Sequence, residues 1–178
     1  MNHSDQTKQI TAQTEKMLID QYERLYRLAY SYVHNEADAL DIVQESACKA
    51  ITQCKNLKDT EKLFPWLCRI VVNTSLDLLR SRTKEQPAEE LPETATEDTY
   101  EEFDLKEALN HLEPKNRTII ILRYFEDMKL EDIALAVAEN VNTVKARLYR
   151  SLKKLRIHLD GTASFLKKGA YINERTGS

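Results

Sequence analysis

The chain has 178 residues, of which 42% are hydrophobic, and its 26 basic and 29 acidic side chains give a net charge of −3. With only three Gly and four Pro, this composition favours one all-α domain or two small ones. No apolar run reaches the ~20 residues that span a bilayer, and the N-terminal stretch lacks the apolar core of a signal peptide. Three cysteines without CxxC spacing and four scattered histidines predict reduced thiols in a cytoplasmic protein, with no metal site and no cofactor.

Apolar side chains recur at three- and four-residue steps in the first half of the chain, which predicts amphipathic helices over 15–34 and 36–53. Residues 55–63 are polar and predict a loop. A third helix is expected over 64–82, where Pro65 falls in the first turn, a position that tolerates proline.

The middle of the chain is strongly acidic: residues 85–102 hold eight acidic side chains and no basic one. Two prolines and few apolar residues add to the prediction of a flexible, self-repelling linker over 84–102. A short helix is expected over 103–112, and another from Pro114 to about Phe125. The predicted layout is two small helical domains, 1–83 and 103–160, joined by this linker and followed by a tail, 161–178, to which we assign no role.

The segment LEDIALAVAENVNTVKARLYRSLKKLR, residues 130–156, predicts a helix-turn-helix. Its first helix has one apolar side and the small Ala134, which allows a close approach. Asn140 is expected to take the left-handed conformation of the turn, and Asn142 or Thr143 to cap the second helix.

The second predicted helix combines an apolar stripe with a basic surface, as residues 141–168 hold eight basic side chains and one acid. A solvated surface helix remains the alternative to a DNA-reading helix. A helix that enters the major groove places its first turns on base edges and its cations on phosphates. On that hypothesis the DNA-binding residues are Thr143, Lys145, Ala146, Arg147, Arg150, Lys153 and Lys154.

Three sequence motifs, in the order that the family shows, resemble the extracytoplasmic-function (ECF) sigma factors of the sigma-70 family. LEPKNRTIIILRYFEDMKLEDIA with NTVKARLYRSLKKLR resembles the promoter-reading region 4 of this family. NEADALDIVQESACKAI resembles its polymerase-binding helix, and FPWLCRIVVNTSLDLLRSR resembles its W-L-x-R-I-x-x-N-x-x-x-D-x-x-R helix. Two positions depart from the family: Ala138 and Asn142 stand where glycine is usual.

The resemblance implies roles for both predicted domains. The polymerase-binding face would comprise Asp38, Asp41, Gln44 and Glu45. Contacts to the −10 element, including a base flipped into a pocket of the preceding loop, would come from Asn56, Lys58, Lys62, Trp66, Arg69, Asn73 and Arg80. Trp66 fits either a stacking platform or a core position.

The sequence is thus expected to encode a non-enzymatic promoter-specificity subunit that binds core RNA polymerase, reads −35 and −10 elements and takes no small-molecule substrate. The resemblance also implies stress-response genes and control by an anti-sigma factor, often membrane-bound. A stand-alone helix-turn-helix repressor, which would bind palindromic duplex without polymerase, is the alternative. A helical adaptor without a nucleic-acid role is a third class, and the basic helix argues against it.

Overall fold

The computed structural model describes residues 3–57, 59–85, 105 and 107–158. In these ranges the chain is helical and contains no strand, which confirms the predicted all-α class. No helix in this part of the chain combines the length and apolar character needed to cross a membrane. The linker over 86–102 and the tail over 161–178 lie outside the described residues. The helices of the first half are α1 (His3–Asp20), α2 (Tyr22–Val33), α3 (Glu36–Gln53) and α4 (Leu63–Glu85).

The helix expected over 15–34 is in fact two helices that meet at Gln21. Gln21 has φ −111° and ψ 13°, which is outside the helical range, and α1 reaches back to His3. By contrast, α3 covers the predicted 36–53, and its start is fixed because the Asn35 side chain accepts a hydrogen bond of 2.8 Å from the Asp38 backbone N–H. The predicted polar loop over 55–63 contains one short 3₁₀ turn, Thr60–Lys62, and most of another, Cys54–Asn56.

The second half contains a helix-turn-helix at the predicted position. α6 (Pro114–Ile120) continues as a π-helical turn (Ile121–Phe125), and α7 (Leu130–Val137) then leads through a tight turn into α8 (Val141–His158). Of the residues expected over 103–112, those at 105 and 107–110 are helical.

The turn between α7 and α8 differs from the sequence prediction in two residues. The left-handed residue is Ala138, with φ 54° and ψ 46°, and not Asn140. Asn140 instead caps α8: its side-chain oxygen accepts hydrogen bonds from the Thr143 N–H (2.8 Å) and hydroxyl (3.1 Å). The predicted caps Asn142 and Thr143 therefore lie inside the helix, because the turn is shorter than the sequence suggested.

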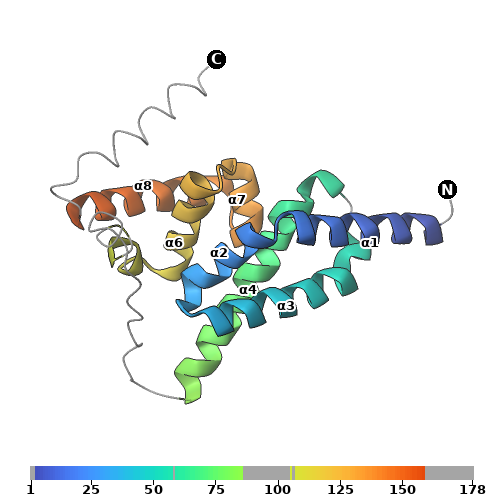
Figure 1. Ribbon diagram of the computed structural model, residues 1–178. Coiled ribbons are helices and arrows are strands. Elements are labelled where there is room, and N and C mark those ends of the chain that lie inside the picture. Colours follow the sequence, from blue (N-terminus) through green and yellow to red (C-terminus); the bar gives the residue numbers. More distant parts are fainter. Residues whose placement is uncertain (1–2, 58, 86–104, 106, 159–178) are drawn as a thin grey trace.

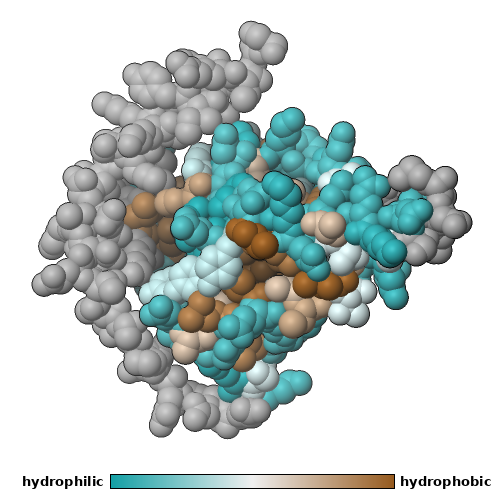
Figure 2. Space-filling model, turned by 45° about the vertical axis from the view of Figure 1, so that its right-hand side comes forward, coloured by the Kyte–Doolittle hydropathy of each residue, from teal (hydrophilic) through white to brown (hydrophobic). Residues whose placement is uncertain are grey.

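The two helical units, α1 to α4 and α6 to α8, pack against each other in one body. Figure 1 shows α7 beside α4 and α6 beside α2, and the buried apolar side chains of both units form one continuous cluster. Leu67 and Val71 of α4 and Ile133 of α7 are each exposed by at most 1%. The face seen in Figure 2 is hydrophilic around its rim, and apolar residues gather in its middle.

Polar contacts reinforce this packing. The carboxylate of Glu126, 3% exposed, pairs with both Arg24 and Arg27, and Arg24 also donates a hydrogen bond of 2.9 Å to the Glu126 carbonyl. The hydroxyls of Tyr32 and Thr118 bond to each other in the same interface. Burial raises the pKa of Tyr32 to about 12, so its hydroxyl stays protonated.

Candidate nucleic-acid interface

The helix α8 has one buried side and one basic side. Val144, Leu148 and Leu155 are buried against the rest of the unit. The exposed residues of the predicted DNA-binding set are Lys145, Ala146, Arg150, Lys153 and Lys154. A duplex could therefore reach these cations without any movement of α8 within its unit, and phosphate contacts of this kind set the position of a helix on DNA.

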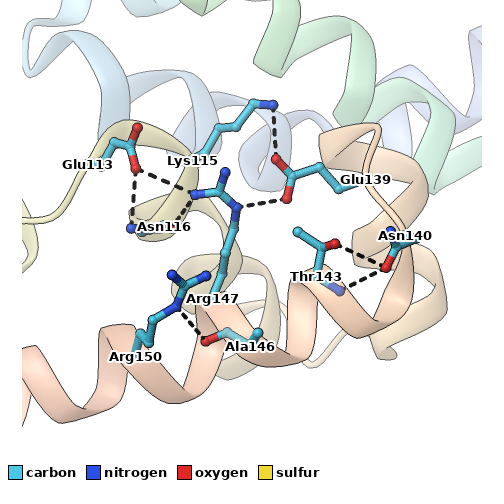
Figure 3. A network of polar contacts seen from close by, with 9 residues as sticks. All are labelled: Glu113, Lys115, Asn116, Glu139, Asn140, Thr143, Ala146, Arg147 and Arg150. Atoms are coloured by element: carbon cyan, nitrogen blue, oxygen red, sulfur yellow. Dashed lines mark hydrogen bonds and ion pairs between the residues drawn. The ribbon is translucent and has the colours of Figure 1, made fainter.

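Arg147 has a different environment from its neighbours on α8 (Figure 3). Its guanidinium donates to Glu139 at 2.8 Å and to Asn116 at 3.0 Å, and lies 3.5 Å from Glu113. Only 25% of its side chain is exposed. These bonds tie α8 to the turn before it and to α6, so Arg147 holds the helix-turn-helix together in this conformation.

Glu139 is the centre of that network and was not identified from the sequence. It also accepts a hydrogen bond of 3.2 Å from Lys115 at the start of α6. Burial opposes ionisation of Glu139, but the hydrogen bonds from Lys115 and Arg147 outweigh burial and lower its pKa. The ion pairs bring together residues 8 and 24 positions apart in sequence, and charge pattern alone gives no signal for such a pairing.

The helix α4 exposes polar groups along the surface that the sequence assigned to the −10 element. Arg69, Asn73 and Arg80 are exposed, and Arg80 pairs with Asp77 one turn away at 3.3 Å. Trp66 is half-buried and packs against the apolar cluster. The indole thus contributes to the core and keeps part of its surface accessible for stacking.

The loop before α4 carries the remaining −10 candidates. Asn56 is exposed, whereas Lys58 lies outside the described residues. Lys62 forms an ion pair of 2.8 Å with Asp132 on α7. The hydrogen bond to Asp132 is the main cause that raises the Lys62 pKa, so this cation is already engaged by the second unit.

The face assigned to polymerase binding is partly engaged within the chain. Asp41, Gln44 and Glu45 are exposed along α3, although Glu45 pairs with Lys49 at 2.6 Å. Asp38 is only partly exposed, and its carboxylate lies 2.5 Å from the Arg82 guanidinium of α4. That hydrogen bond lowers the Asp38 pKa, with burial opposing it.

Comparison with known proteins matches each unit to a protein-family model. The family model for sigma-70 region 2 matches residues 18–85, and that for sigma-70 region 4 matches residues 102–155. RNA polymerase sigma factor SigV of Bacillus subtilis is 46% identical over 156 residues, which cover 83% of this chain and 94% of that protein. The RNA polymerase sigma-E factor of Streptomyces coelicolor is 31% identical over 150 residues, covering 82% of this chain and 85% of that protein.

A solved structure has the same arrangement of helices. It is the sigma factor RpoE of Bartonella quintana in complex with the anti-sigma factor NepR, and it aligns with a TM-score of 0.72 at 25% identity. The alignment covers 83% of this chain and 96% of that one. CnrH in complex with the cytosolic domain of CnrY aligns with a TM-score of 0.66 at 21% identity, covering 88% and 96%, and supports the fold alone.

Proposed function

Because the chain belongs to the sigma-70 family of RNA polymerase sigma factors, in its extracytoplasmic-function group, we propose that it is the subunit that directs core polymerase to promoters. The observation that carries the proposal is the order of regions 2 and 4 along one chain, combined with the exposed basic side of α8. It recognises promoters and catalyses no bond-making itself, and it acts in the cytoplasm, where polymerase and DNA are found.

The roles of the two units follow the predicted division. The unit over 103–160 reads −35 duplex, with Lys145, Ala146, Arg150, Lys153 and Lys154 at the DNA and Thr143 at the helix N-terminus, where backbone N–H groups favour phosphate. Arg147 contacts the DNA when phosphate or a base replaces Glu139 as the partner of its guanidinium. Without DNA, Arg147 stabilises the position of α8 through its hydrogen bond to Glu139.

The unit over 1–83 docks on polymerase through α3 and captures the melted −10 strand. We assign docking to Asp41, Gln44 and Glu45, and to Asp38 once it leaves Arg82. We assign −10 capture to Asn56, Lys58, Lys62, Trp66, Arg69, Asn73 and Arg80. Cations and a half-buried aromatic are the groups that hold single strands by charge and stacking.

An anti-sigma factor that binds both units, often anchored in the membrane, is the proposed regulator, and genes of a stress response are the proposed targets. Support for the regulator comes from the Bartonella structure, in which a related sigma factor is bound to such a protein. Core polymerase and promoter DNA remain the functional partners, without a small-molecule substrate.

Run-off transcription on fragmented genomic DNA tests the function directly. With purified core polymerase, the protein should create discrete new start sites that share sequences near −35 and −10. Absence of protein-dependent starts from a folded sample would refute the proposal. Binding of palindromic duplex without polymerase would instead favour the repressor alternative.

Three variants test the assigned faces. Asp41→Lys should weaken binding to core polymerase, whereas Glu15→Lys, which reverses another exposed acidic side chain, on α1, should leave it unchanged. Arg150→Ala should lower use of the −35 element while core binding persists. Equal core affinity for Asp41→Lys and wild type would remove α3 from the docking face.

A further inference from the structure

A polar cleft with a volume of about 460 Å³ lies between α1 and the loop that precedes α4. The loop contributes Lys55, Leu57 and Thr60, and α1 contributes Gln6, Gln9 and Gln13. The three glutamines are spaced three and four residues apart, so they lie on one side of the helix, and all three are exposed. Clefts of this size are large enough to bind small organic groups.

The wall formed by α1 is fixed to the loop by buried contacts. Ile10 lines the cleft and is 9% exposed, while Thr14 one turn later is fully buried. The Thr11 hydroxyl lies 3.7 Å from the sulfur of Cys54, which is 1% exposed in the first 3₁₀ turn of the loop. The glutamines are therefore held at a set position relative to Lys55 and Thr60.

The chemistry of the lining suits an unpaired nucleobase with its phosphate. No acidic side chain is among the described residues that line the cleft, and Lys55 supplies a cation. A glutamine amide offers a donor and an acceptor side by side, and nucleobases present the same pair along their edges. Bases that leave a stack are recognised by hydrogen bonds to these edges.

We propose that Gln6, Gln9 and Gln13 are specificity-determining residues that read one unpaired base of the −10 strand from the α1 side of this cleft. The inference rests on the proposed promoter-reading function and extends it, because α1 then becomes a second wall of the base pocket. Lys55 holds the adjoining phosphate, and Leu57 packs against the base.

The test compares holoenzymes that contain wild type, Gln9→Ala, Gln13→Ala or the triple variant with Gln6→Ala. Gln53→Ala is the matched control, because Gln53 is exposed at the end of α3 and does not line the cleft. Alanine favours helix at least as well as glutamine, so α1 should still fold. Templates carry each of the four bases at every −10 position of a promoter mapped by run-off transcription.

The cleft variants should lose base preference at one −10 position by roughly 5- to 100-fold, with core binding and −35 dependence unchanged. The control should match wild type. Unchanged preference at every position by the cleft variants, or a uniform loss that follows weaker core binding, would overturn the inference while leaving the sigma function intact. Failure of wild type to initiate at any promoter would overturn the sigma function and this inference together.

Discussion

Ala138 lies in the turn between α7 and α8 in a backbone conformation that glycine adopts without steric cost. Its φ of 54° and ψ of 46° are left-handed, and its side chain is exposed. Substitution by glycine would remove the clash between the Cβ and the following carbonyl oxygen without leaving a cavity. We therefore expect Ala138→Gly to stabilise the protein.

The magnitude is the difference between two opposing effects. Relief of the left-handed alanine is worth roughly 1–2 kcal/mol, whereas glycine increases the entropy of the unfolded chain at a cost of about 0.4–1 kcal/mol. The middle of each range gives a net gain in the free energy of unfolding of about 0.8 kcal/mol, which corresponds to about 2–3 °C in Tm for a chain of this size.

Urea unfolding followed by circular dichroism measures this gain. The control is Ala12→Gly, because Ala12 is also exposed but lies inside α1, where glycine should destabilise by about 1 kcal/mol. A gain in the free energy of unfolding for Ala138→Gly and a loss for Ala12→Gly would support backbone strain at Ala138. A loss of stability at position 138 as large as that at position 12 would refute it.

Three further variants test contacts described above. Glu126→Gln removes the buried charge that pairs with Arg24 and Arg27, so urea unfolding should show a free energy of unfolding lower by about 1–3 kcal/mol. An unchanged free energy of unfolding would argue against these ion pairs. The lowered pKa of Glu139 stabilises the fold above its unfolded pKa, and this stability is lost as the pH falls through the folded pKa. Glu139→Gln should therefore lose less stability than wild type between about pH 6 and pH 3, and parallel curves would contradict the assignment. The affinity for −35 duplex should fall with salt, and Lys153→Ala should make the slope of log affinity against log salt less steep by about one. An unaltered slope would place Lys153 away from phosphate.

The sequence predicted correctly the helices whose caps and apolar periodicity are contained within one or two helical turns. The bounds of α3 were correct because Asn35 caps a clear apolar periodicity. The break at Gln21 carries no glycine or proline, so the sequence predicted one helix where there are two. Ala138 is left-handed although its type disfavours that conformation, which shows that packing of α7 against α8 decides the turn.

The candidate site depends more on contacts that sequence spacing cannot reveal. A basic helix was predicted, but its charges alone could not distinguish the exposed Arg150 from Arg147, whose partners lie on α6 and in the turn. Likewise, the Lys62–Asp132 and Arg24–Glu126 pairs join residues 70 and 102 positions apart. The packing of the two units was therefore not foreseen.

This packing has a thermodynamic consequence for promoter search. The −35 and −10 elements are named for positions 25 base pairs apart, which is about 85 Å at 3.4 Å per pair. Because α7 packs directly on α4 in this structure, reading both elements at once requires the two units to separate. If only the separated form engages polymerase, the apparent dissociation constant equals the intrinsic one divided by the fraction of molecules that are open. Each contact that Lys62 or Glu126 makes between the two units would then lower the apparent affinity of the protein for polymerase. The stability of this interface would thereby set the protein concentration at which transcription responds.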